Sequence, residues 1–160
     1  MRVVVYVIVT LIVVGMIVAM VGSALAGDGP CREEAAARIS AEHLPVTLLG
    51  RRTDVPSLME AADAVVQTSL WEGQPLTIQE ALRAGAAIVA TDVGGTAVTA
   101  RGGAVLVVPE AQAIAGALTT LLTDPEAGSR ARLSAREAAG LLPGPEDLAA
   151  QLRQVVLAQD

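Results

Sequence analysis

The sequence predicts an α/β domain with a mainly parallel sheet of about five strands and helices on both faces. Two observations carry this prediction: short apolar runs alternate with stretches of helical periodicity, and glycine-rich loops follow several of the runs. A third observation sets residues 1–26 apart from the domain that we expect at residues 27–160. These first residues are so apolar that they predict a helix ahead of the sheet.

The predicted strands are short, and four of them are nearly all apolar. Strands of a parallel sheet are covered on both faces, so they read as continuous apolar runs rather than as alternating ones. The runs are Ser23–Ala26, Val46–Leu49, Ala64–Gln67, Ile88–Thr91 and Val105–Val108.

Amphipathic stretches between and after these runs predict the helices. Pro75 stands where a helix favours proline, Gly85 follows the end of that helix, and Asp124-Pro125 stops the next long one. The stretches are Cys31–Glu42, Val55–Ala62, Pro75–Ala84, Ala111–Leu122, Glu126–Ala139 and Glu146–Gln159.

The N-terminal segment from Val3 to Ala26 has no charged residue. As a helix it would be roughly 36 Å long, enough to cross a hydrocarbon core of about 30 Å. We therefore expect a transmembrane helix in residues 3–26, with the domain membrane-associated and in the cytoplasm. Two alternatives stay open. Ala24-Leu25-Ala26 resembles a signal-peptide cleavage site, or the segment belongs to a soluble cytoplasmic protein and these residues end a strand.

Composition excludes several classes of function. With 17 carboxylates against 11 bases, the chain has no basic surface for a nucleic acid. All the bases are arginine, so no chemistry that needs a lysine is present. Cys31 is the only cysteine, which rules out an internal disulfide and a multi-cysteine metal site. We expect no metal ion and no cofactor.

Three glycine-rich loops follow predicted strands: Gly27-Asp28-Gly29-Pro30, Glu72-Gly73-Gln74-Pro75 and Asp92-Val93-Gly94-Gly95. The carboxyl ends of parallel strands meet at one edge, where loops and helix N-termini direct N–H groups at phosphates. Two carboxylates accompany them, Glu72 in a loop and Glu80 on the following helix. They suit sugar hydroxyls, although two solvated glutamates near a helix start are an equally simple interpretation.

Several segments resemble the C-terminal, donor-binding domain of family-four retaining glycosyltransferases, which have the GT-B fold and a Rossmann-like sheet. They are GDGP at residues 27–30, LGRRTDVPSLMEAADAVVQTSLWEGQPLTIQEALRAGAAIVATDVGG at residues 49–95, LVVP and LLTDP. The resemblance implies transfer of a sugar from a nucleoside diphosphate, UDP- or GDP-linked, to an acceptor hydroxyl. It implies retention of configuration and no metal.

The resemblance also implies residue roles. Glu80 would hold the ribose hydroxyls, and Glu72 would contact hydroxyls of the donor sugar. The backbone of Gly73, Gln74 and Pro75, with Gly27 and Gly29, would lie against the sugar and diphosphate. The base would lie along residues 50–55, which include Gly50, Arg51, Arg52 and Val55. The resemblance assigns no catalytic residue.

The chain departs from the family's pattern in ways that bear on activity. A complete enzyme of this family has an N-terminal acceptor-binding domain, which we expect to be missing here; whether a separate chain supplies it stays open. The Arg and Lys that normally precede GDGP are absent, Val98 stands in place of Glu, and Ala87 in place of Pro. The domain is therefore expected to be incomplete as a lone chain. A non-catalytic, membrane-tethered relic or interaction module is the alternative, whereas a receiver-like domain would need a lysine.

Three further residues carry weaker expectations. His43 is expected at the surface, in a polar loop. Cys31 takes a position that the family fills with leucine, so we expect it to pack in the core. Trp71, directly before Glu72, is expected to pack under the loop, with a place beside the sugar as the alternative.

Overall fold

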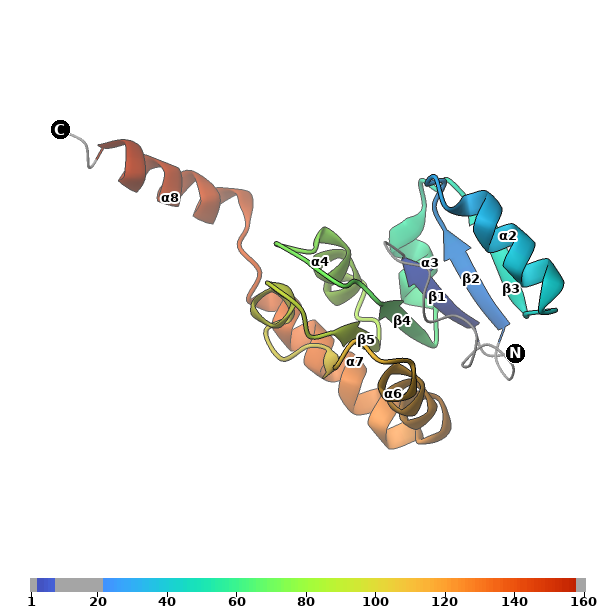
Figure 1. Cartoon of the computed structure of the whole chain (residues 1–160). Helices are drawn as coiled ribbons and strands as arrows, with labels where there is room; N and C mark the ends of the chain where they lie inside the picture. Colours follow the sequence, from blue (N-terminus) through green and yellow to red (C-terminus); the bar gives the residue numbers. More distant parts are fainter. Residues whose placement is uncertain (1–2, 8–21, 158–160) are drawn as a thin grey trace.

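The computed structural model describes residues 3–7 and 22–157. Its six strands form one parallel sheet in the order β3-β2-β1-β4-β5-β6 (Figure 1). The strands are β1 (Val3–Val7), β2 (Gly22–Ala26), β3 (Val46–Gly50), β4 (Ala64–Gln67), β5 (Ile88–Thr91) and β6 (Val105–Val107). The five predicted strands are thus present, and the predicted α/β class with a parallel sheet is confirmed.

The N-terminal segment corrects one prediction. Val3–Val7 is a central strand that pairs with β2 on one side and β4 on the other, and Gly22–Ala26 is β2. The prediction of a continuous helix over residues 3–22 is therefore wrong for Val3–Val7 and for Gly22. The rest of that segment, residues 8–21, lies outside the described part of the chain. Valine-rich runs favour strands as readily as membrane helices, because β-branched side chains suit a pleated surface.

Two further findings concern the N-terminal part of the chain and its membrane prediction. The sheet includes residues ahead of Gly27, where the sequence placed the start of the domain. Within the described residues, no helix combines the length and the apolar character that a membrane crossing needs.

Helices follow the strands as the sequence predicts, with bounds shifted by one or two residues. They are α2 (Arg32–Ala41), α3 (Val55–Ala61), α4 (Leu76–Arg83), α5 (Thr96–Ala100), α6 (Ala111–Thr123), α7 (Pro125–Gly140) and α8 (Pro145–Leu157). The sequence gives no clear sign of α5, which is too short to show a periodic pattern. Helix α8 extends away from the rest of the domain (Figure 1).

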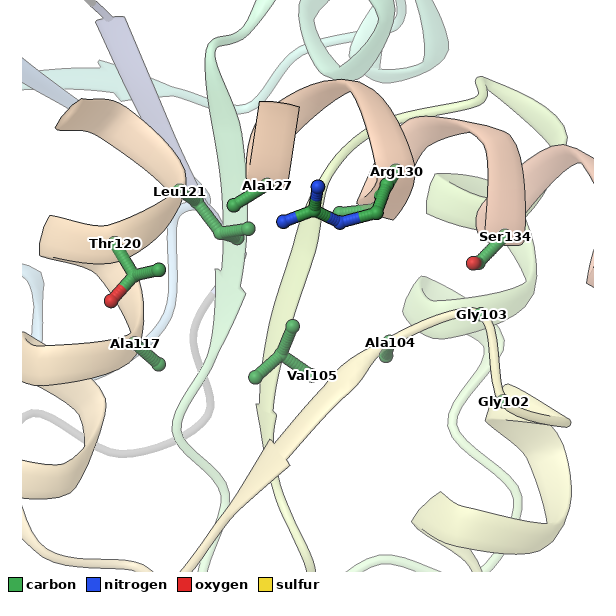
Figure 2. Close-up of a pocket in the computed structure, with 11 residues that line it drawn as sticks. Gly102, Gly103, Ala104, Val105, Ala117, Thr120, Leu121, Ala127, Arg130 and Ser134 are labelled. Atoms are coloured by element: carbon green, nitrogen blue, oxygen red, sulfur yellow. The ribbon is translucent and has the colours of Figure 1, made fainter. Parts of the chain in front are cut away.

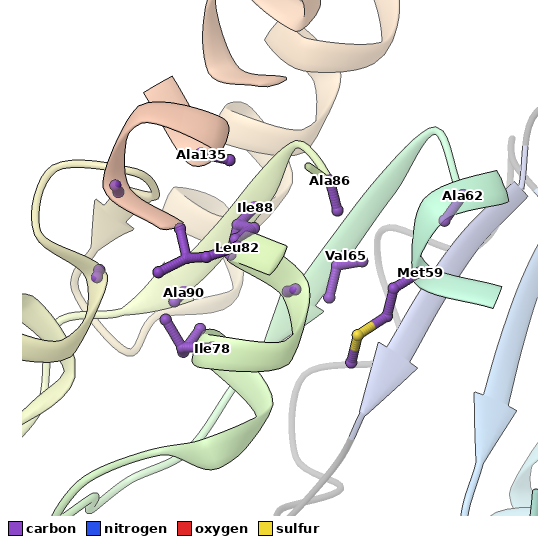
Figure 3. Close-up of a cluster of buried hydrophobic side chains, with 12 residues drawn as sticks. Met59, Ala62, Val65, Ile78, Leu82, Ala86, Ile88, Ala90 and Ala135 are labelled. Carbon is purple, nitrogen blue, oxygen red and sulfur yellow. The ribbon is translucent and has the colours of Figure 1, made fainter. Parts of the chain in front are cut away.

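The core has two layers, one on each face of the sheet. On one face Val65, Ile88 and Ala90 pack with buried residues of α3, α4 and α7 (Figure 3). On the other face Val66 and Val89 pack against α6. Successive residues of a strand point to opposite faces, so adjacent residues of β4 and β5 serve different layers. Helices therefore cover both faces, as predicted.

The strand order places a particular loop at the centre of one edge. From β1 the chain proceeds to β2 and β3 on one side, and β4 begins the other half, so the order reverses between β1 and β4. Open α/β sheets bind ligands at such a reversal, beyond the carboxyl ends of the strands. The loop that follows β4 carries Glu72, Gly73, Gln74 and Pro75.

Candidate functional site

The loop after β4 is tied to the neighbouring strand at its first residues. The buried hydroxyl of Thr91, the last residue of β5, donates a hydrogen bond to the main-chain oxygen of Ser69 at 2.6 Å. Ser69 is itself fully buried. This bond fixes the direction in which the chain leaves the sheet, three residues before Glu72.

The carboxylate of Glu72 is held by two side chains, one from the last residue of β4 and one from the loop that follows it. Its Oε1 accepts a hydrogen bond from Gln67 Nε2 at 2.8 Å and another from Ser69 Oγ at 2.6 Å. Glu72 is only partly buried. The carboxylate is thus anchored from the protein side while remaining accessible to solvent, as a group that binds ligand hydroxyls needs to be.

The loop before α5 supports the main chain of residues 72 and 73. Gly95 N donates to Glu72 O at 2.9 Å. A Cβ on Gly94 would overlap the carbonyl oxygen of Glu72, and a Cβ on Gly95 would overlap that of Gly73. Gly94 also has a φ of +51°, a conformation that favours glycine. The two loops can approach this closely only because both residues lack a side chain.

Glu80 lies one turn into the helix that this loop begins. Pro75 is the extended residue just before α4, and Glu80 is exposed. Ile78, Ala81 and Leu82 occupy the buried face of α4, so Glu80 lies on the opposite face. With a rise of about 1.5 Å per residue, it is about 6 Å along the helix axis from Leu76. Glu72 and Glu80 therefore belong to one rigid loop–helix unit.

The glycines of the other predicted loop join two strand ends. Gly27 N donates to Gly50 O at 2.8 Å, across the carboxyl ends of β2 and β3. Gly27 and Gly29 are exposed, and nothing in the described part of the chain lies within 4 Å of a Cβ at either position. Among the described residues, the main chain beside the end of β2 is therefore left uncovered.

The two arginines predicted along the base differ in what they contact. Arg51 is exposed. Arg52 donates two hydrogen bonds to Asp54, from Nε to Oδ1 at 2.8 Å and from Nη2 to Oδ2 at 2.5 Å. These bonds raise the pKa of Arg52 and lower the pKa of Asp54. The charge of Arg52 is thus largely matched by Asp54, while Val55 begins α3 and packs against the core.

A cavity of about 280 Å³ opens beside the loop after β4. Gly73, Gln74 and Gln79 line one side, and Gly95, Val98, Thr99, Arg101, Leu142 and Pro143 line the rest. Ligand pockets usually measure about 300–1,000 Å³. This one therefore has room for part of a nucleotide sugar rather than for all of it.

A larger cavity of about 360 Å³ lies between α6, α7 and the start of β6 (Figure 2). Val105, the first residue of β6, lines it together with Arg130 and Ser134 of α7. It thus lies toward the amino end of β6, and none of the predicted site residues lines it. We do not assign it to the candidate site.

Three side chains test the weaker sequence predictions. His43 is exposed, as predicted. Cys31 is exposed and does not pack in the core, because it lies just before α2 rather than on its inner face. Trp71 is 77 % exposed, so the prediction that it packs under the loop is wrong. Its Cη2 would lie 3.6 Å from a Cβ at Gly73.

Sequence reasoning missed the two donors that hold Glu72. The sequence pattern places Gln67 only at the end of a predicted strand and assigns no role to Ser69. A signal was present, since Gln67 is the one polar residue in the run Ala64–Gln67. A polar residue at the carboxyl end of a buried strand indicates a partner at the edge of the sheet.

These features define a class of protein. A parallel sheet in the order 3-2-1-4-5-6, with glycine loops at the carboxyl edge and a carboxylate-bearing loop at the reversal point, is a Rossmann-like α/β domain, a class of fold that binds nucleotides at this edge.

Comparisons with known proteins identify the family. The family described as "Glycosyl transferases group 1" matches residues 11–124. The chain is 32 % identical over 101 residues to the lipopolysaccharide core biosynthesis mannosyltransferase LpsB of Rhizobium meliloti (strain 1021), covering 60 % of this chain and 27 % of LpsB. It is 44 % identical over 48 residues to an Escherichia coli UDP-Gal:alpha-D-GlcNAc-diphosphoundecaprenol alpha-1,3-galactosyltransferase, covering 30 % of this chain and 12 % of that enzyme.

Solved structures of glycosyltransferases have the same fold as this chain. Anabaena HepE in complex with UDP-glucose has a TM-score of 0.83 and 26 % identity, with 98 % of this chain and 48 % of that chain covered. Sucrose-phosphate synthase of Thermosynechococcus elongatus has a TM-score of 0.82 and 25 % identity, with 99 % and 45 % covered.

The chain belongs to the glycosyl transferase group 1 family, and the resemblance to GT-B glycosyltransferases is confirmed. It spans about half the length of these structural relatives, 48 % and 45 %, and a smaller share of the curated ones.

Proposed function

We infer that this chain is the donor-binding half of a retaining glycosyltransferase, which holds a nucleoside-diphosphate sugar for transfer to an acceptor hydroxyl. Glu80 binds the ribose and Glu72 binds the donor sugar. The main chain of residues 73–75, with Gly27 and Gly29, lies against the sugar and diphosphate. The base lies along residues 50–55. The donor is UDP- or GDP-linked, and the UDP and UDP-glucose complexes of HepE support the first of these.

The observation that carries this proposal is the preorganised loop after β4. The main chain of this loop accepts a hydrogen bond from Gly95, and the carboxylate of Glu72 is anchored through its Oε1 atom. Groups fixed before a ligand arrives lose little conformational entropy when it binds. A solvated glutamate with no function would not need two buried donors on one oxygen.

The test is a titration of the chain with UDP, UDP-glucose, GDP and GDP-mannose, by calorimetry and by tryptophan emission. Trp71 is the only tryptophan, and it directly precedes Glu72, so its emission reports on this loop. Glu80→Ala is expected to weaken both nucleotides and nucleotide sugars about tenfold or more, since a hydrogen bond to a charged group contributes roughly 1.5–3 kcal/mol. Glu72→Ala is expected to weaken only the sugar-bearing ligands.

The matched control is Glu60→Ala. Glu60 is exposed and lies near the C-terminal end of α3, which in a parallel α/β fold is the end away from the carboxyl edge. Glu60→Ala is expected to leave the affinities for all four ligands unchanged. Equal losses in the Glu72 and Glu80 variants would contradict the assigned roles, and a wild-type chain that binds none of the four ligands would contradict the function itself.

One observation favours the alternative of a non-catalytic module. The chain contains no lysine, no charged residue lies between Val3 and Ala26, and Arg52 is paired with Asp54. A diphosphate bound here would meet few unpaired cations, and helix dipoles compensate for only part of its charge. Under this alternative the fold persists with weak or no nucleotide binding, so the same titration separates the two functions.

A further inference from the structure

The carboxyl end of β4 places polar side chains where the fold alone favours apolar ones. Gln67 is 2 % exposed and Ser69 is fully buried, directly after Ala64, Val65 and Val66, which are also fully buried. Burying an amide or a hydroxyl is unfavourable unless it finds hydrogen-bond partners. The hydrogen-bond partners of these two side chains therefore indicate why polar residues are present here.

Both donors are directed at a single carboxylate oxygen. Gln67 Nε2 and Ser69 Oγ donate to Glu72 Oε1 at 2.8 and 2.6 Å, and Gln67 Nε2 also lies 3.3 Å from Ser69 Oγ. With Oε1 held at two points, the plane of the carboxylate is fixed and so is the position of Oε2. A fixed second oxygen is what recognition of a particular sugar hydroxyl requires.

The same amide leaves one of its own atoms unpaired. Gln67 Oε1 is buried and has no hydrogen-bond partner in the described part of the structure. Rotating the amide by half a turn would not relieve this, because it would place an acceptor against the acceptor Glu72 Oε1. Such an orphaned group lowers stability, and an apolar side chain of similar volume would avoid the loss. Folding alone therefore gives no reason for glutamine here.

We propose that Gln67 and Ser69 are positioning residues that orient Glu72 toward the donor sugar, with Gln67 present at a cost in stability. The proposal rests on the proposed function, because it assumes that Glu72 meets the sugar. It goes further in assigning discrimination between a nucleotide sugar and the bare nucleotide to two residues that do not themselves touch the ligand.

The test is Gln67→Met in the 160-residue chain, since methionine is of similar length but donates no hydrogen bond. Affinity is measured for whichever pair the wild-type chain binds, UDP and UDP-glucose or GDP and GDP-mannose. The nucleotide sugar is expected to bind about tenfold more weakly and the bare nucleotide within about twofold of wild type. The melting temperature is expected to stay the same or to rise. Gln154→Met, an exposed substitution on α8, is the matched control.

A double-mutant cycle with Glu72→Ala separates positioning from direct contact. Because Gln67 acts through Glu72, Gln67→Met is expected to cause no further loss once Glu72 is absent. Ser69→Ala is expected to behave in the same way.

Three results would overturn the proposal while leaving the proposed function intact. They are unchanged discrimination in Gln67→Met, an additive loss in the double variant, and a lower melting temperature with both ligands weakened equally. A wild-type chain that binds no nucleotide would overturn the proposed function and this inference with it.

Discussion

The contact between Gly95 and the loop after β4 allows a prediction with a magnitude. A Cβ on Gly95 would overlap the carbonyl oxygen of Gly73 and lie 2.9 Å from its carbonyl carbon. Both partners are main chain, so neither can rotate away as a side chain could. Gly95→Ala must therefore displace the loop and break the bond from Gly95 N to Glu72 O.

The cost combines two known effects. Overpacking costs about 1–3 kcal/mol, and a lost hydrogen bond adds about 0.5–1.5 kcal/mol, which together give about 1.5–4.5 kcal/mol. For a chain of 160 residues, 1 kcal/mol shifts the melting temperature by roughly 2–4 °C. We therefore expect Gly95→Ala to melt about 3–18 °C lower, and to lose ligand-induced changes in Trp71 emission because Glu72 moves with the loop.

The assay is thermal unfolding followed by circular dichroism, with a ligand titration on the folded variant. Gly116→Ala is the matched control, since Gly116 lies within α6 and nothing lies within 4 Å of a Cβ there. Alanine is the better helix former by about 1 kcal/mol, so this control is expected to melt slightly higher. A Gly95→Ala variant that melts and binds like the wild type would refute the argument from close approach.

Two further predictions concern charge and catalysis. The pKa of Asp54 is lowered by its hydrogen bonds from Arg52. The pair therefore contributes to the stability of the fold at any pH above the usual carboxyl pKa of about 3.9. This contribution is lost as the pH falls through the lowered pKa. Arg52→Ala is expected to raise the Asp54 pKa in a carbon-13 NMR titration, and an unchanged titration curve would disprove this cause. The second assay incubates the 160-residue chain alone with radiolabelled UDP- and GDP-sugars and with lipid and sugar acceptors, and we expect no sugar transfer. Positioning the acceptor can lower the activation barrier of the reaction by about 7–11 kcal/mol, and this chain covers only 48 % of HepE. Turnover that Glu80→Ala abolishes would refute it.

Most of the sheet could be predicted from the sequence because strands covered on both faces have one simple signature. Ala64–Gln67 and Ile88–Thr91 were predicted with the bounds that the structure shows. The segment Val3–Val7 was missed as a strand for a physical reason. A valine-rich run without charge satisfies both a membrane helix and a central strand, and only pairing with β2 and β4 distinguishes them. That pairing depends on distant residues, which no local pattern contains.

The candidate site divides in the same way between main chain and side chains. Its main-chain part was predictable, because glycines at strand ends such as Gly94 and Gly95 indicate close approach before the approaching partner is known. Its side-chain part was not. The burial of Ser69 and the exposure of Trp71 depend on which way the chain turns after β4, and that turn is set by a hydrogen bond from Thr91 on another strand.

The anchored carboxylate and the scarcity of unpaired cations lead to opposite expectations for a ligand. Glu72 is fixed through one oxygen by two buried donors, which favours a neutral hydroxyl-bearing group such as a sugar. A second negative charge close to that oxygen would be repelled, and Arg52 is already paired with Asp54. The sugar end of a donor is therefore better matched to these residues than the diphosphate end. We therefore expect the ratio of the affinities for nucleotide sugar and for bare nucleotide to respond more strongly to changes at these residues than either affinity alone.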